Sequence, residues 1–153
     1  MHVPGKTVSL FLVDPLAEEY CAMLNTYGFH DTVRPIKVDG EKLTTVFPAH
    51  YFDICSCANA LDHSYDPITV IRQMVAVCKP GGWIFLLHII NVAESENYAG
   101  LHQWNLDWRN ERFVIWNKTA TIDVLEAIPE LISIENQMFP GSPPGMSQWM
   151  QRS

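Results

Sequence analysis

Acidic and imidazole side chains follow the apolar segments of this chain, where an α/β sheet commonly places its chemistry. Asp14 ends the apolar run 8–13. Asp62 and His63 come just after the apolar run 51–58. A carboxylate can accept hydrogen bonds from two hydroxyls, and bonds to a charged group are the stronger kind. A histidine or a carboxylate can also take a proton from a hydroxyl. These residues therefore indicate recognition of hydroxyl groups and proton transfer.

The elements that would position these residues alternate between strand and helix. Apolar runs at 8–13, 32–38, 51–58 and 83–90 predict strands, and apolar residues at helical spacing predict a helix over 16–27. Asp66 and Pro67 suit the start of a second helix, which Lys79-Pro80-Gly81-Gly82 ends. This succession predicts a doubly wound, mostly parallel sheet with right-handed crossovers.

The chain changes character after residue 90. Residues 91–111 are polar and aromatic, which predicts an excursion over the end of the sheet. Runs at 112–116 and 132–137 predict late antiparallel strands, with a short helix or turn near 123–128, and the tail at 140–145 is expected to be irregular. The aromatic and amide cluster Tyr98, His102, Gln103, Trp104 and Asn105 could line an acceptor pocket or pack as a lid.

Composition restricts the class of protein. The chain has 153 residues, of which 48% are hydrophobic and 18% charged, as expected of one globular domain over 1–153. A net charge of −7 argues against nucleic acid or an anionic membrane as partner. Nothing resembles a membrane span or a signal peptide, so we expect a cytoplasmic protein. The four cysteines lie in apolar segments and are expected to be reduced core residues.

Four motifs in order resemble class I S-adenosylmethionine-dependent methyltransferases. Phe52-Asp53-Ile54 opens a strand, Leu61-Asp62-His63 follows it, Asp66-Pro67 begins a helix, and Lys79-Pro80-Gly81-Gly82 leads into the next strand. The match covers roughly residues 8–90. The resemblance implies a Rossmann-like sheet and S-adenosylmethionine as cofactor. It also implies that no counterpart of the family's first strand and Gly-rich loop precedes Val8, so the domain would be incomplete at its N-terminus.

The resemblance also assigns roles to residues. Asp14 would bind the cofactor ribose and Asp39 the adenine amino group, and the cofactor-binding set as a whole is Asp14, Asp39, Gly40, Asn59 and Ala60. Near the methyl acceptor, the candidate catalytic residues are Asp62, His63 and His88. For three of these residues a structural role competes. Asp14 could begin a helix, Asp39 could form a turn before Gly40, and His63 could be structural.

Several alternatives stay open at this stage. A metal site from Asp39, Asp62, His63 and Asp66 is conceivable, but solvated or capping acids are the default, so no metal is expected. The acceptor would be a small or polar molecule, with a sugar-like molecule as one candidate. The alternative function is a non-catalytic remnant that self-associates through exposed sheet edges into a homo-oligomer. A nicotinamide-dependent reductase is disfavoured, because G-x-G-x-x-G is absent.

Overall fold

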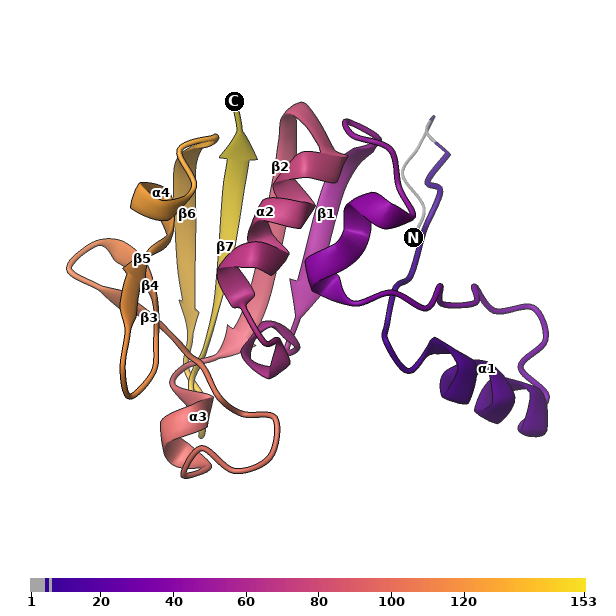
Figure 1. Ribbon diagram of the computed structural model, residues 1–153, viewed down its shortest axis with the longest axis horizontal. Coiled ribbons are helices and arrows are strands. Elements are labelled where there is room, and N and C mark those ends of the chain that lie inside the picture. Colours follow the sequence, from indigo (N-terminus) through magenta and orange to yellow (C-terminus); the bar gives the residue numbers. More distant parts are fainter. Residues whose placement is uncertain (1–4, 6) are drawn as a thin grey trace. The chain divides into compact units, whose positions relative to one another are not determined.

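A four-stranded mixed sheet in the order β1-β2-β7-β6 forms the centre of the larger part of the chain (Figure 1). Its strands are β1 (Phe52–Ala58), β2 (Cys78–Ile89), β6 (Leu131–Phe139) and β7 (Gly145–Arg152). β1 runs parallel to β2, whereas β7 runs antiparallel to both of its neighbours. Of the late antiparallel strands expected, the run 132–137 is β6 of this sheet, and the neighbouring β7 was not expected.

This sheet belongs to the second of two units. The computed structural model describes Gly5 and residues 7–153, and the chain divides into the units Met1–Gly40 and Glu41–Ser153. Each unit has its own contacts and is described by itself. The expectation of one domain over 1–153 stays a prediction.

Helix α2 (Pro67–Val77) connects the two parallel strands and begins as predicted. The Asp66 carboxylate accepts hydrogen bonds from the N–H groups of Ile68 and Thr69 at 3.0 and 3.2 Å. Pro67 occupies the first turn, where its missing N–H costs nothing. The buried face of α2, which includes Ile71, Met74 and Val75, packs on β2. This β-α-β unit places the end of β1 and the end of β2 at the same edge of the sheet.

Alternation along β2 separates a covered face from a more open one. Ile84, Leu86 and His88 are buried, whereas Trp83, Phe85 and Leu87 between them are half-buried. On the open face, Phe85 contacts Trp149 of β7, with ring centroids 4.5 Å apart. The covered face is therefore the core of the larger unit, and His88 lies within it.

A three-stranded antiparallel sheet, β3-β4-β5, contributes to the covered face. It contains β3 (Asn105–Arg109), β4 (Arg112–Trp116) and β5 (Thr121–Asp123). Along the chain, the short helix α3 (Val92–Ser95) precedes these strands and the short helix α4 (Val124–Ala127) follows them. Phe113 of β4 stacks on His88 of β2, which brings this sheet onto the core of the larger one. The predicted excursion after residue 90 is thus a small sheet with a preceding loop.

The smaller unit contains helix α1 (Ala17–Thr26), close to the predicted bounds. Its two predicted strands are reduced to a single parallel bridge between Val13 and Ile36, supported by a hydrogen bond from Ile36 N to Leu12 O at 2.8 Å. The prediction of a buried strand at 8–13 is wrong, because Leu10 is 59% exposed and its neighbours are exposed as well. A short 3-10 helix, η1 (Gly40–Thr45), begins at the end of this unit.

Two further predictions differ from the structure. Lys79-Pro80-Gly81-Gly82 was expected as a turn between helix and strand, but these residues lie within β2, where the register with β1 jumps from Cys78 to Trp83. The irregular segment expected at 140–145 is present at 140–144, whereas the strand that follows it, β7 at Gly145–Arg152, was not expected. The α/β class with antiparallel additions is confirmed. No helix among the described residues is long and apolar enough to cross a bilayer.

Candidate functional site

The carboxyl end of β1 leads into a tight turn that carries several predicted site residues. Asn59 adopts a left-handed conformation, with φ at 47°, and its N–H donates to Leu87 O at 2.8 Å. Ala60 then precedes the short 3-10 helix η2 (Leu61–His63). Leu61 is only 2% exposed. Its burial holds the turn at the carboxyl end of the parallel strands, where open α/β sheets bind ligands.

A third side chain reaches this turn from a distant part of the sequence. His102 lies in the loop between α3 and β3, and its Nδ1 is 2.7 Å from Asp62 Oδ2. His63 Nε2 is 3.2 Å from His102 Nδ1 and 3.3 Å from Asp62 Oδ2. The two imidazole rings meet edge to face, with centroids 4.5 Å apart. These three residues form what we call the aspartate–histidine cluster.

Burial within the cluster is uneven. The Asp62 side chain is 5% exposed, whereas those of His63 and His102 are 37% and 33% exposed. A buried carboxylate is costly unless it is paired or hydrogen-bonded, and here the imidazole nitrogens supply that pairing. The cluster therefore presents imidazole edges outward over a buried carboxylate. It can accept or donate hydrogen bonds, take up a proton, or coordinate a cation.

The loop that carries His102 is braced by its own side chains. Gln103 Nε2 donates to Tyr98 O and to Gly100 O, each at 2.9 Å, and Gln103 N donates to Asp62 O at 3.4 Å. Trp104 Nε1 donates to Tyr65 O at 3.3 Å. Of the two expectations for this aromatic and amide segment, the structure favours the packed lid, because its polar groups bond locally and to η2.

His88 does not join the cluster through any hydrogen bond among the described residues. Its side chain is in the core at 3% exposure, and neither ring nitrogen has a hydrogen-bond partner there. Burial lowers the pKa of His88 to about 4, and the neighbouring Gln148 side chain opposes this shift without cancelling it. The arrangement is that of a neutral core imidazole. A catalytic role for His88 stays a prediction that this burial does not support.

The remaining cofactor candidates lie in the smaller unit. Asp14 Oδ1 accepts a hydrogen bond from Leu16 N at 2.8 Å just before α1, but α1 has Leu16 at its N-cap and no side-chain capping bond, so the alternative of Asp14 as helix cap is wrong. Asp39 is half-buried and precedes η1, which begins at Gly40. Both acids follow the two segments that the Val13–Ile36 bridge joins. Their roles in binding the ribose and the adenine stay predictions.

The residues considered for a metal site make different contacts in the structure. Asp66 is occupied in capping α2, where its Oδ2 also accepts from Thr69 Oγ1 at 2.7 Å. Asp62 and His63 instead meet His102, and the three ligand atoms lie within 4.8 Å of one another. The spacing of residues in the sequence did not predict that His102 pairs with Asp62, because the two residues are 40 positions apart. The expectation that no metal binds stays a prediction.

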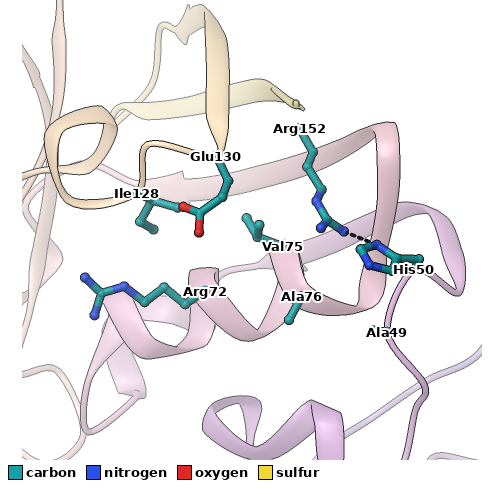
Figure 2. A pocket seen from close by; sticks show the side chains of 8 residues that line it. All are labelled: Ala49, His50, Arg72, Val75, Ala76, Ile128, Glu130 and Arg152. Carbon is teal, nitrogen blue, oxygen red and sulfur yellow. Dashed lines mark hydrogen bonds between the residues drawn. The ribbon is translucent and has the colours of Figure 1, made fainter.

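A pocket of about 330 Å³ lies at the other end of β1. His50, which lines it, immediately precedes β1, whereas Asp62 follows that strand. Figure 2 shows the hydrogen bond from Arg152 Nη1 to His50 Nδ1, 2.9 Å long, and the Glu130 carboxylate above α2. Arg152 Nη1 also donates to Cys78 O. Because it contains no predicted site residue and is remote from η2, we do not assign it to the chemistry of the aspartate–histidine cluster.

The four cysteines are free thiols, but only Cys78 is buried, and Cys21, Cys55 and Cys57 are half-buried, so the expectation of core cysteines fits Cys78 alone. A hydrogen bond with Cys78 raises the pKa of Cys55, and burial raises that of Cys57 to about 11. The hydrogen bond from Cys55 lowers the pKa of Cys78, which is fully buried. None of the three contacts the aspartate–histidine cluster through a hydrogen bond among the described residues. The charge of Asp62 does, however, contribute to the raised pKa of Cys57.

Known proteins resemble parts of this chain in sequence. It is 36% identical over 72 residues to the ubiquinone biosynthesis O-methyltransferase of Bordetella bronchiseptica, covering 46% of this chain and 30% of that protein. It is 25% identical over 122 residues to the enzyme of the same name from Hahella chejuensis, covering 69% of this chain and 51% of that protein. The chain therefore spans at most about half the length of these two relatives.

Solved structures share the fold. The N-methyltransferase NodS of Bradyrhizobium japonicum, in complex with S-adenosyl-L-homocysteine, superposes with a TM-score of 0.60 at 14% identity, over 94% of this chain and 66% of that one. A possible histamine N-methyltransferase from Thermotoga maritima gives 0.61 at 13% identity, over 92% and 72%. A family described as "Methyltransferase domain" matches residues 10–86, about half of the chain. Together with the motifs and the sheet, this match shows that the chain belongs to the class I S-adenosylmethionine-dependent methyltransferase family.

Proposed function

We propose that the chain takes part in transfer of a methyl group from S-adenosylmethionine to a hydroxyl of a small acceptor. The observation that carries the proposal is the aspartate–histidine cluster at the carboxyl end of β1 in a chain of this family. The relatives named for O-methylation in ubiquinone biosynthesis favour a hydroxyl as the acceptor atom. A small hydroxylated ring of the ubiquinone-precursor kind is the acceptor class that this likeness supports.

Methyl transfer requires the protein to align the methyl donor with the acceptor hydroxyl and to remove the proton of that hydroxyl. S-adenosylmethionine supplies the methyl group when bound. As the acceptor oxygen bonds to the methyl carbon, the bond from that carbon to sulfur breaks, and the hydroxyl proton has to leave. His63 and His102 are each about one third exposed and can accept a hydrogen bond from the hydroxyl and then its proton. Asp62 lies against both rings and orients them.

The cofactor side of the proposal rests on the smaller unit and on the turn after β1. Asp14 uses Oδ1 at the start of α1, which leaves Oδ2 for a ribose hydroxyl. Asp39 and Gly40 follow the segment that the Val13–Ile36 bridge supports. Asn59 and Ala60 form the turn after β1. Carboxylates such as those of Asp14 and Asp39 suit the hydroxyls and the amino group of adenosine as hydrogen-bond acceptors.

Two measurements test the two halves of the proposal. Calorimetric titration with S-adenosylhomocysteine should show saturable binding that Asp14→Ala weakens at least about tenfold, because a charge-assisted bond is lost. Asp31→Ala is the matched control, since Asp31 is an exposed acid of the same unit.

Mass spectrometry should then detect methylation of a dihydroxylated benzoate in the presence of S-adenosylmethionine. Absence of S-adenosylhomocysteine binding would refute the cofactor half, and binding without product on phenolic acceptors would refute the acceptor half.

Self-association through a sheet edge is the second candidate. β1 is an edge strand in the order β1-β2-β7-β6, and Ile54 on it is 55% exposed. Such an edge offers unpaired backbone groups to another chain. Light scattering across a concentration series should then give a mass above that of a monomer, and Ile54→Lys should reduce it. A monomer at every concentration would contradict this candidate without touching the first.

A further inference from the structure

The ligand-bearing atoms of the aspartate–histidine cluster all lie within or near hydrogen-bonding distance of one another. His102 Nδ1, His63 Nε2 and Asp62 Oδ2 are separated pairwise by 2.7, 3.2 and 3.3 Å. Each imidazole nitrogen carries either one proton or one lone pair toward the others. For every combination of tautomers of the two rings, at least one of the three contacts has no hydrogen atom between the two atoms that it joins and is therefore not a hydrogen bond. A cation at the centre would satisfy all three lone pairs at once.

The separations fit one face of a six-coordinate ion. Metal–nitrogen and metal–oxygen bonds of about 2.1 Å place neighbouring ligand atoms of an octahedral ion about 3.0 Å apart. The three observed separations lie on both sides of that value. Two imidazoles and one carboxylate on a single face leave the opposite face open. The exposed edges of His63 and His102 are where that open face would meet solvent or an acceptor.

The donor types select the class of metal. Magnesium and calcium take oxygen ligands, whereas imidazole nitrogen suits first-row transition ions. Two of the three ligands here are imidazoles. Asp62 contributes the single negative charge from a buried position, which strengthens its attraction to a cation. The backbone bond from Gln103 N to Asp62 O holds the His102 loop beside the other two ligands.

We propose that the aspartate–histidine cluster binds a divalent first-row transition-metal ion through Asp62 Oδ2, His63 Nε2 and His102 Nδ1. Because His102 comes from the loop after α3 and the other two ligands from η2, the ion ties these segments together. The binding rests on the ligand set alone. Its consequence for catalysis rests on the proposed methyl transfer: with the ion bound, the lone pairs of His63 and His102 are used in ligation, and the open face of the ion would receive the acceptor hydroxyl in their place.

The test is titration of the chelator-treated chain with Co²⁺, followed by visible absorption and calorimetry without cofactor or acceptor. We expect saturable binding of a single Co²⁺ ion. Zn²⁺ should displace this ion, whereas Mg²⁺ at the same concentration should not. Loss of a ligand costs more than loss of an outer-shell partner, so His102→Ala and His63→Ala should each weaken binding more than about 100-fold. His30→Ala, an exposed histidine outside the cluster, should bind as the unchanged chain does.

Other results would overturn the proposal. Absorption bands of cobalt–thiolate bonds that survive in His102→Ala would place the ion on the cysteines. Absence of saturable binding in the unchanged chain would refute the site outright. Hydrogen exchange is the second readout: Co²⁺ should slow exchange at residues 98–103, and unchanged exchange with bound ion would refute the tie between loop and η2. None of these measurements needs methyl transfer, so their failure is separate from failure of the proposed function.

Discussion

The imidazole ring of His88 lies parallel to the ring of Phe113, with centroids 5.6 Å apart and an angle of 8° between the planes. This stack joins β2 to the small β3-β4-β5 sheet in the middle of the core. It places a titratable ring where water does not reach, because His88 is 3% exposed. A protonated imidazole there would be an uncompensated buried charge.

His88 makes the stability of the fold depend on pH. Its pKa is about 4 in the folded chain, against 6.5 when unperturbed. Above that unperturbed value the ring is neutral in both states. As pH falls below it, the unfolded chain binds a proton that the folded chain does not, so the free energy of unfolding falls. Between about pH 7.5 and about pH 5 the loss should be about 2 kcal/mol.

Urea unfolding at these two pH values measures the effect against His88→Leu. Because carboxylates also titrate in acid, the informative quantity is the difference between the unchanged chain and the variant at each pH. That difference should shift in favour of the variant at low pH. If it stays constant, His88 is not buried in the neutral form.

The two glycines of Lys79-Pro80-Gly81-Gly82 should respond differently to alanine. A Cβ on Gly82 would lie 2.7 Å from Cys78 Sγ, 2.8 Å from Lys79 O and 2.9 Å from Asp53 O. Gly81 has open space around it and φ at 74°. Gly82→Ala should therefore cost about 2–3 kcal/mol through overpacking, and Gly81→Ala about 1 kcal/mol through backbone strain.

Equilibrium unfolding of both variants compares these costs. Cys78→Ala in the Gly82→Ala background should restore little, because the two carbonyl oxygens remain. Full recovery in that double variant would show that the sulfur alone opposes the added methyl group.

Asp66→Ala should destabilise the larger unit by about 1 kcal/mol, because two N–H groups at the start of α2 lose their acceptor. Asp66→Ser keeps a capping oxygen and should lose much less. Thermal unfolding of the two variants side by side measures the difference. Equal losses would show that the charge of Asp66, rather than its capping bonds, matters there.

Gln103→Ala should loosen the His102 loop while leaving global stability nearly unchanged. The substitution removes two hydrogen bonds, to Tyr98 O and Gly100 O, in a loop with little buried apolar surface. Neutral hydrogen bonds contribute about 1 kcal/mol each, and local openings draw on such small energies. Hydrogen exchange at residues 98–103 should accelerate. Global unfolding that falls in step with it would instead make Gln103 a core determinant.

Local patterns in the sequence determined much of the larger unit. The apolar run before Asn59 gave β1, and Asp66 with Pro67 gave the start of α2, because capping and periodicity act over a few residues. The same local signals, in order, carried the family resemblance. They also placed Asp62 and His63 at the carboxyl end of a strand, where the structure has them.

Only the tertiary structure decided what those residues meet. His102 pairs with Asp62 across 40 positions because the excursion after β2 folds back onto η2, which no local pattern encodes. His88, at the end of an apolar strand, faces the core because β4 covers that side of β2. Residues 8–13 are apolar enough for a buried strand but form one bridge, because a strand is completed by its neighbours and not by its own composition.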